Sequence, residues 1–490
     1  MKKYYILIII VMAGLMSCKK WLEVTPQTDI SQDVLFSTQA GFEEALNGVY
    51  SRCVGEDSYG KELSFGFPEV LAQNYSITPD DPRGYRQAAL YNYDDDQFIY
   101  KRDAAWLALY AAIANSNLIL HHIEGKERLF SGREYELIKG EALALRAYLH
   151  FDLLRMFGPS YANDPVAPAI PYVKDFSNKI TPMSTVTGVL DSAIQDLNAA
   201  KQLLKVADPI LDAGYKVGYP VKDSSTEENG PLFLQNRRHR LNYYAVCGEL
   251  ARVLLYRGNK AEALANALEV INSNKFPWTR QNDFLNPDDE KKDRVLYREL
   301  LFAWYIPNGN LTKVINDWFR DGDNALFITS TEGRNLYETG GVGGEDNRFK
   351  QWFSEKSGGL GTRMQLEKYY RDPDRNMHYL VAPALRLSEM YYIAAECTFD
   401  ADPEKAWSYF NTVRFNRGIG RTITNETSKD VFLNELVKES RKEFYGEGQI
   451  FYTYKRLNKP IIGFAGATNP ATNRIFVIPL PDDEIQFGNR

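Results

Sequence analysis

Two distant stretches of the chain repeat the same order of small and large residues. They start at Leu241 and Leu385 and read LNYYAVCGELARVLLYRGNKAEALANALEVI and LRLSEMYYIAAECTFDADPEKAWSYFNTVR. Aligned without gaps, they place Ala251 opposite Ala394 and keep small or apolar residues at the following core positions. Small residues let paired helices approach closely and large ones fill the space to the next pair, as in tetratricopeptide repeats. The pattern predicts stacked helical hairpins.

Other segments have the same helical periodicity. Apolar and small residues recur at three- and four-residue spacing in residues 103–124 and 134–157, and a further helix is expected at 186–205. A last helical pair is expected at 429–457. We therefore predict a mostly α-helical fold with four tetratricopeptide-like hairpins as its scaffold.

An irregular segment separates the second hairpin from the third. Residues 274–382 are rich in Gly, Asn and Asp, are expected to form loops and short strands, and contain four of the seven tryptophans. Stacked hairpins do not need such a segment for their own packing, and loops carried by a rigid scaffold often bind ligands. We expect one domain over residues 18–490, with an N-terminal part at about 18–230 and a C-terminal part at about 231–490.

The N-terminus has the pattern of an exported lipoprotein. Lys2 and Lys3 precede an uncharged stretch of secretory length, too short to span a bilayer, and the sequence then reads LMSC. Leucine at −3, a small residue at −1 and cysteine at +1 resemble the bacterial lipobox. We predict that residues 1–17 are a signal peptide and that Cys18 is a lipid anchor.

The composition excludes several classes of protein. A net charge of −6 with scattered basic residues offers no footprint for nucleic acid. The other cysteines, Cys53, Cys247 and Cys397, are odd in number and lack C-x-x-C spacing, so we expect buried thiols. The five histidines form no H-E-x-x-H motif, and neither a nucleophile elbow nor a phosphate loop is present. We predict no catalytic residues, no metal and no cofactor, and hence no enzyme.

Six short motifs, in order, are similar to those of the SusD/RagB family of Bacteroidetes outer-membrane lipoproteins. Besides the lipobox, the resemblance rests on WLEVTPQ (21–27), GFEEALNGVYS (41–51), the spaced residues Trp106, Tyr110, Ile113 and Asn115, KGEALALRAYLHFDLLRMFG (139–158), ESRKEFYGEGQ (439–449) and IPLPDDEI (478–485). It implies a SusD-like fold over the whole mature chain. It further implies a non-catalytic, lipid-anchored protein of the outer membrane that faces the cell exterior, binds glycan and passes it to a SusC-like TonB-dependent transporter.

In the family, sugar binds at a shallow surface site that corresponds to residues 74–93 and 302–320 here. Pyranose rings present C–H groups that pack on aromatic rings, and their hydroxyls need paired donors and acceptors. The residues of these regions with suitable side chains are Asp80, Asp81, Arg83, Tyr85, Arg86, Trp304, Tyr305, Asn308, Asn310 and Trp318. Trp304 and Tyr305 are adjacent, so on a strand one of the two rings would point into the core.

Two alternatives remain open at this level. A lipoprotein built from tetratricopeptide-like repeats could act as a scaffold in envelope assembly, binding its partner in the concave groove of the repeats. A SusD-like protein could also bind a nutrient that is not a glycan, such as a peptide.

Overall fold

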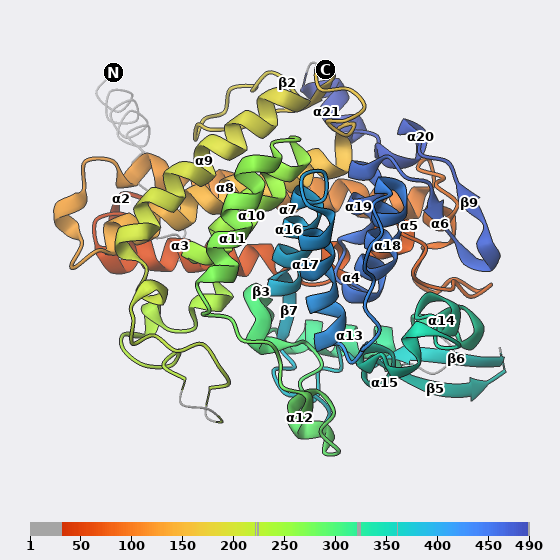
Figure 1. Cartoon of the computed structure of the whole chain (residues 1–490). Coiled ribbons are helices and arrows are strands. Elements are labelled where there is room, and N and C mark those ends of the chain that lie inside the picture. The colour runs from red at the N-terminus through yellow and green to blue at the C-terminus, as the bar shows by residue number, and fades with distance from the viewer. Residues whose placement is uncertain (1–31, 221, 223–224, 321–324, 360, 489–490) are drawn as a thin grey trace, which may run out of the picture.

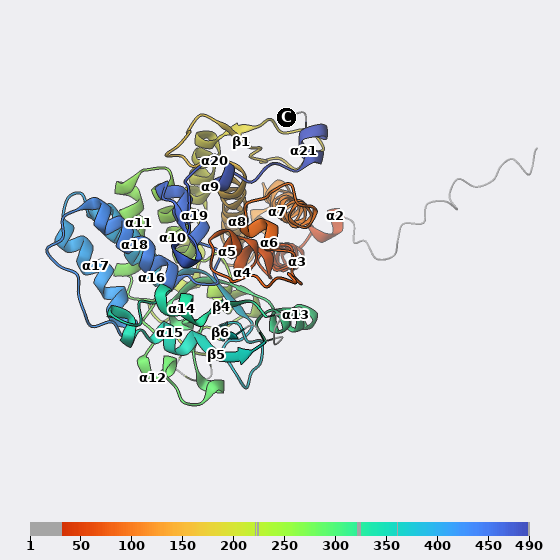
Figure 2. The same cartoon turned by 90° about the vertical axis from the view of Figure 1, so that its right-hand side faces the viewer.

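The computed structural model of the protein describes residues 32–220, 222, 225–320, 325–359 and 361–488. The predicted signal peptide and the predicted lipid anchor Cys18 lie outside these residues. The described chain is mostly helical, with a few short strands, which confirms the predicted fold class. In both Figure 1 and Figure 2, the part with the longer strands lies below the helical layers.

The N-terminal half forms a helical layer around α8. Its helices are α2 (Gln32–Leu35), α3 (Gln39–Cys53), α4 (Glu62–Phe65), α5 (Phe67–Leu71), α6 (Arg86–Ala89), α7 (Asp96–Ile123), α8 (Glu134–Phe157) and α9 (Val186–Ala207). Helix α8 packs against α7 on one side and α9 on the other, and its last 18 residues are all buried. The short strands β1 (Pro168–Ile170) and β2 (Ser184–Thr185) pair between α8 and α9.

Helix α7 is long and apolar enough by composition to cross a membrane. Its most apolar 18-residue window has a mean hydropathy of 1.2, and 44% of that window is buried inside the protein. The helix packs against α3 and α8, as a core helix of a folded domain does. We therefore assign α7 to the fold rather than to a membrane.

The C-terminal half contains the predicted repeats. The hairpins are α10 (Tyr243–Tyr256) with α11 (Lys260–Asn272), α16 (Leu387–Thr398) with α17 (Pro403–Asn416), and α18 (Lys429–Glu443) with α19 (Ile450–Leu457). Helix α11 packs on α16, so residues far apart in sequence form one continuous stack (Figure 1). The thiols of Cys53 and Cys247 are buried and that of Cys397 is partly buried, and all three are free.

The segment between the second and third hairpins forms small antiparallel sheets. Strand β3 (Leu300–Tyr305) pairs with β7 (Val381–Arg386), and β6 (Gly361–Leu366) lies between β4 (Phe327–Thr329) and β5 (Phe353–Gly358). The helices of this segment are α12 (Gln281–Phe284), α13 (Gly309–Arg320), α14 (Ser330–Leu336) and α15 (Asn347–Trp352). The chain then closes with β8 (Ile461–Ile462), β9 (Thr468–Asn469), α20 (Asn473–Phe476) and α21 (Asp482–Phe487).

A buried network of ion pairs joins this segment to the helical stack. The carboxylate of Glu443 in α18 accepts hydrogen bonds from Arg348 (3.0 Å), Arg417 (2.7 and 2.9 Å) and Arg386, all fully buried. Arg417 also donates to Glu299, at 2.6 and 3.0 Å. Because buried charges are tolerated only when they are paired and hydrogen-bonded, these residues fix one another.

The glycines that follow α18 complete the same motif. The backbone N–H groups of Gly446 and Gly448 donate to the buried carboxylate of Glu69, at 2.9 and 2.7 Å. Gly448 has a φ of +69°, and a Cβ there would lie 2.5 Å from the carbonyl oxygen of Leu63. Through these hydrogen bonds to Glu69 of α5, the segment ESRKEFYGEG connects the C-terminal part of the chain to the N-terminal helical layer.

We predict that Glu443→Gln lowers the free energy of unfolding by about 3–5 kcal/mol, since it leaves buried guanidinium groups without their counter-charge. Glu44→Gln, at an exposed position of α3, is the matched control and should change it by less than about 0.5 kcal/mol. The measurement is urea unfolding of the purified proteins. Equal midpoints for the two variants would contradict the assigned role of Glu443.

We also predict a loss of stability in acid that depends on Glu439. Burial opposes its ionisation, but Arg348 and Lys442 outweigh burial and lower its pKa to about 2 from an ordinary value of 4.5. Because the pKa of Glu439 is lower in the folded than in the unfolded protein, its ionised carboxylate stabilises the folded state by on the order of 3 kcal/mol. This stabilisation is complete above about pH 4.5 and is lost as the pH falls towards 2. Urea unfolding between pH 6 and 2 should show a shallower acid dependence for Glu439→Gln than for the wild type, and identical slopes would refute this.

Candidate functional site

Strand β3 presents two adjacent aromatic rings to opposite sides. Trp304 is 1% exposed and stacks on Tyr59, with ring centroids 4.4 Å apart and an interplanar angle of 9°. Tyr305 is 43% exposed. Pairing with β7, which places Trp304 opposite Ala382 and Tyr305 opposite Val381, fixes this orientation. Of the two rings, Tyr305 is the one that a ligand can reach.

Tyr305 lies at a surface cavity of about 970 Å³, here called the Tyr305 pocket. Three parts of the chain line it: α3 with the turn that follows it, residues 232–240, and the segment from the end of β3 into α13. Trp304, Tyr305, Asn308 and Asn310 are among its lining residues. The structure thus brings four of the predicted residues together.

The ring of Tyr305 is supported from behind. It stacks on the imidazole of His239, with centroids 5.1 Å apart and an interplanar angle of 6°, and Tyr297 holds that imidazole through a hydrogen bond of 3.1 Å. Burial, with a smaller contribution from Arg238, lowers the pKa of His239 to about 3, so the imidazole is neutral. A flat, uncharged support leaves the other face of Tyr305 for a ligand.

Polar groups surround this ring. The side-chain oxygen of Asn308 accepts from the backbone N–H groups of Asn310 (2.9 Å) and Leu311 (3.1 Å) and so caps the start of α13. This leaves the Asn308 Nδ2 and the amide of Asn310 without partners among the described residues. The indole Nε1 of Trp304 also has no hydrogen-bond partner there, but it is buried and is not offered to a ligand. The pocket therefore offers donors and acceptors beside an aromatic face.

The charged side chains of the pocket are already neutralised. Glu56 pairs with Lys61, and Arg240 donates to Glu141 at 2.9 Å and to the side-chain oxygen of Asn47 at 2.7 Å. The Tyr305 pocket is thus suited to an uncharged ligand that carries hydroxyl groups.

The other predicted aromatic residues pack inside the protein. Tyr85 is fully buried, donates its hydroxyl to Glu62 (2.7 Å), and lies edge-on to Trp318, with centroids 5.8 Å apart. Trp318 is 5% exposed. The expectation that Tyr85 and Trp318 present their rings to a ligand is not met by this arrangement, because their faces are used in packing.

The polar residues before α6 stabilise their own loop. Asp81 accepts from the backbone N–H groups of Tyr85 (2.8 Å) and Arg86 (2.9 Å), and Arg86 donates to the carbonyl of Pro79 (3.1 Å). Arg83 donates to the carbonyl of Asp317 at 2.9 Å, near the end of α13.

Asp80 is exposed and, like Asp81, Arg83, Tyr85 and Arg86, does not line the Tyr305 pocket. Asn308 and Trp318 are ten residues apart along α13, roughly 15 Å at 1.5 Å per residue. The 74–93 loop contacts the C-terminal end of α13, whereas the Tyr305 pocket lies at its N-terminal end, so the predicted residues of the loop do not share that cavity.

Sequence reasoning missed the contributions of α3 and of residues 232–240. Asn47, Ser51, Gln235, Asn236 and His239 come from helices and loops far from β3 in sequence. Asn47 and Ser51 belong to the GFEEALNGVYS stretch, which indicates a helix and not a binding site, and the other three carry no motif. Only the tertiary packing brings all five to Tyr305.

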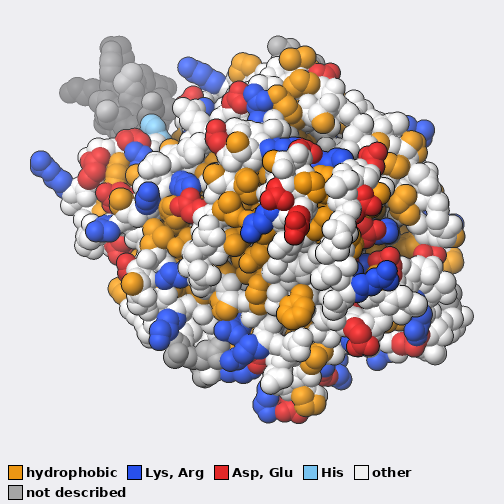
Figure 3. Space-filling view, in the orientation of Figure 1, with side chains coloured by type: hydrophobic (Ala, Val, Ile, Leu, Met, Phe, Trp, Pro, Cys, Tyr) orange, Lys and Arg blue, Asp and Glu red, His pale blue; other side chains and the backbone are white. Residues whose placement is uncertain are grey.

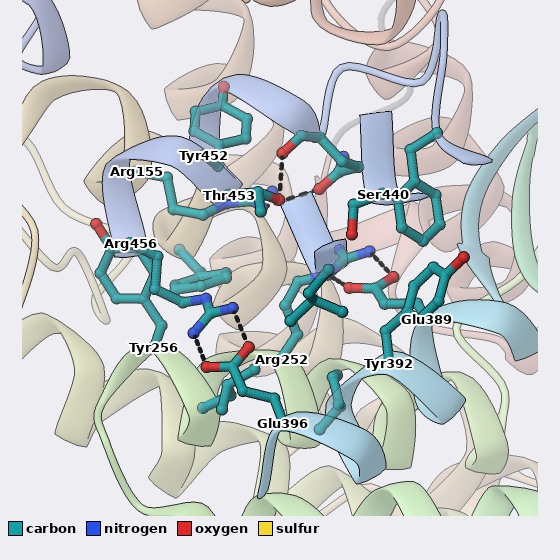
Figure 4. A pocket seen from close by; sticks show the side chains of 16 residues that line it. Arg155, Arg252, Tyr256, Glu389, Tyr392, Glu396, Ser440, Tyr452, Thr453 and Arg456 are labelled. Carbon is teal, nitrogen blue, oxygen red and sulfur yellow. Dashed lines mark hydrogen bonds and ion pairs between the residues drawn. The ribbon is translucent and has the colours of Figure 1, made fainter. Parts of the chain in front are cut away.

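A second cavity, among α8, α10, α16, α18 and α19, is closed by its own charges (Figure 4). Arg252 forms two 2.7 Å hydrogen bonds with Glu389, and Arg456 forms two 2.6 Å bonds with Glu396. At about 70 Å³ this cavity holds a few water molecules at most. It belongs to the packing of the hairpins.

No group of three or more His, Cys, Asp or Glu side chains in the described part of the chain is arranged to hold a metal ion. His121 and His122 are adjacent, with ring centroids 5.1 Å apart, and His239 and His378 stack on tyrosines.

Two family models match consecutive parts of the chain. Residues 20–208 match one described as starch-binding associating with outer membrane, and residues 274–487 match that of the SusD family. SusD-like protein P2 of Formosa agariphila is 23% identical over 547 aligned residues, which cover 99% of this chain and 97% of that protein.

Solved structures share the fold. A SusD superfamily protein of Bacteroides thetaiotaomicron, at 23% identity, has a TM-score of 0.71 over 92% of this chain and 98% of that one. A SusD-like carbohydrate-binding protein of Bacteroides vulgatus, at 18% identity, also has a TM-score of 0.71 and covers 92% and 96% of the two chains. Surface glycan-binding protein A of B. thetaiotaomicron, in complex with laminarihexaose, has a TM-score of 0.64 at 16% identity and covers 92% and 98%.

Proposed function

Because the chain belongs to the SusD/RagB family of carbohydrate-binding proteins associated with the outer membrane, we propose that it captures an oligosaccharide in the Tyr305 pocket. The single observation that carries this proposal is the exposed Tyr305 ring, supported by neutral His239 and flanked by free amides. The crystallised relative with bound laminarihexaose supports glycan as the ligand class.

The proposed binding mode follows from the chemistry of the pocket. A pyranose ring lies with its C–H face on Tyr305, where dispersion and the hydrophobic effect favour it. Its hydroxyl groups exchange hydrogen bonds with Asn308 and Asn310 and with other amides of the rim. Glu56 and Arg240 of the pocket are already paired with Lys61 and Glu141. Because neither charge is left to attract a charged ligand, the site favours a neutral sugar. Nothing in this mode requires a covalent step.

Delivery is the second part of the proposal. Cys18, as a lipidated residue, would hold the protein at the outer surface of the outer membrane, where it passes its ligand to a SusC-like TonB-dependent transporter. An exposed apolar face on α7 supports contact with a protein partner: Tyr100 is 70% and Leu107 68% exposed. These residues are seven apart on one side of the helix, with the partly exposed Ala104 and Ala111 in line with them.

We predict that Tyr305→Ala weakens oligosaccharide binding about tenfold, because it removes the stacking surface. Affinity electrophoresis against a panel of neutral polysaccharides identifies the ligand, and calorimetry with its oligosaccharides then gives the affinity. Tyr100→Ala, at an exposed tyrosine outside the pocket, is the matched control and should bind as the wild type does.

Equal affinities of the Tyr305→Ala and Tyr100→Ala proteins would exclude the Tyr305 pocket as the sugar site. Failure to bind any glycan, together with binding of a peptide, would overturn the glycan assignment and leave nutrient capture in place. Protection of the protein from protease on intact cells would instead favour the scaffold role inside the envelope.

We further predict that Leu107→Asp, which places a charge on the apolar face of α7, abolishes co-purification with the transporter while leaving glycan affinity unchanged. Leu129→Asp, at an exposed leucine outside α7, serves as the control. Detergent extraction and affinity purification from the native cells provide the measurement. Undiminished recovery of the transporter with the Leu107→Asp protein would show that the contact surface does not include this face of α7.

A further inference from the structure

A third cavity differs from the others in its charge. It has a volume of about 460 Å³ and is lined by loop residues between α9 and η4 (Leu232–Leu234), by the chain after α11, and by Arg298 of η7 (Tyr297–Glu299). Four of its ten lining residues are cationic, and none of the ten is an acid: Lys216, Lys275, Arg280 and Arg298. In Figure 3, Lys and Arg side chains gather at the lower left, over the loops that follow α9 in Figure 1.

Arg298 is the cation of this cavity that lacks a counter-charge. Its guanidinium forms neither an ion pair nor a hydrogen bond with any described residue, and its Nε is buried without an acceptor. It lies 5.7 Å from the ring centroid of Tyr219, and the guanidinium of Arg280 lies 5.7 Å from the same ring. Lys222 also lies over this ring, at 5.0 Å, and both Lys222 and Arg280 pair with Asp283. Arg298 is thus the cation at this ring that an anion would stabilise.

Lys275 is held in place by neutral groups. Its ammonium donates to the carbonyl oxygens of Asp212 (2.7 Å) and Tyr215 (2.8 Å), which leaves one donor. Burial lowers its pKa and outweighs the attraction of the Asp212 carboxylate. Lys275 is therefore a positioned cation whose charge is only partly compensated.

Most of the buried arginines elsewhere in the described chain have an acid partner. Arg237 and Arg238, in the neighbouring η5 (Arg237–His239), are fully buried and each pairs with a carboxylate. Arg348, Arg386 and Arg417 do the same around Glu443. Arg371 is an exception, since it is buried and donates to the carbonyl of Tyr379 (2.8 Å). At this cavity Arg280 pairs with Asp283 (2.6 Å), whereas Arg298 has no described partner.

We propose that this cavity, here called the Arg298 site, binds an oxyanion such as a sulfate or carboxylate group, either as a substituent of a glycan or as a free anion. Guanidinium and ammonium donors form their strongest hydrogen bonds with such oxygens. The Arg298 site has its own lining residues and shares none with the Tyr305 pocket. A failure of either proposal therefore leaves the other unaffected.

The test is calorimetric titration of the full mature protein with sodium sulfate at low ionic strength, and separately with dextran sulfate and unsulfated dextran of equal length. Arg298→Gln and Lys275→Met should each weaken binding of sulfate or dextran sulfate at least about tenfold, since each removes a charge-assisted hydrogen bond. Arg128→Gln, an exposed arginine on η2 (Glu127–Leu129), is the matched control and should bind as the wild type does.

The source of the anion follows from the same titrations. Tight binding of dextran sulfate with weak binding of free sulfate identifies a sulfated glycan as the ligand class, and equal affinity per sulfate group identifies the free anion. The Tyr305→Ala protein should retain this binding in full. The proposal is overturned if the wild type binds neither probe, or if both site variants bind as tightly as Arg128→Gln. Lys275→Met keeps the test valid should Arg298→Gln fail to fold.

Discussion

The carboxylate of Glu443 is the interaction on which the arrangement of the molecule depends. It is shared by arginines from α15, from the end of β7 and from the turn after α17, so a single buried group joins the helical stack to the strand-bearing segment. Arg386 is the last residue of β7, which pairs with β3 and sets the direction in which Tyr305 points. The geometry of a surface pocket is thus linked to an ion pair inside the protein.

Two cavities of the same chain have opposite electrostatic character. Around Tyr305, each charged side chain has an internal partner, and what reaches the solvent is an aromatic face with amide groups. Around Arg298, the aromatic face of Tyr219 is already occupied by cations, and the unpaired donors are guanidinium and ammonium groups. Desolvating a charge without compensation is unfavourable, so the two cavities select for ligands of different charge.

Local periodicity explains which parts of the structure could be predicted from the sequence. The helix expected at 134–157 is α8, and the alignment of Ala251 with Ala394 correctly pairs α10 with α16. Helix α7 starts at Asp96, seven residues before the expected 103, because the side chain of Asp95 caps it. The pocket depends on non-local packing instead. The sequence predicted the pocket residues close to Tyr305 along the chain, but not those of α3 and residues 232–240. It also predicted Tyr85 at the surface, whereas the Tyr85 hydroxyl is buried against Glu62.

The alternation of side chains along β3 has a consequence for how proteins of this kind diversify. Trp304 points inward and is held by Tyr59, so replacing it disturbs the core, whereas the ring of Tyr305, one position later, is 43% exposed and stacks on His239 at the pocket. Mutations at the outward position can therefore be sampled at almost no cost in stability. A strand with this arrangement lets ligand preference drift from one descendant to the next while the scaffold stays constant.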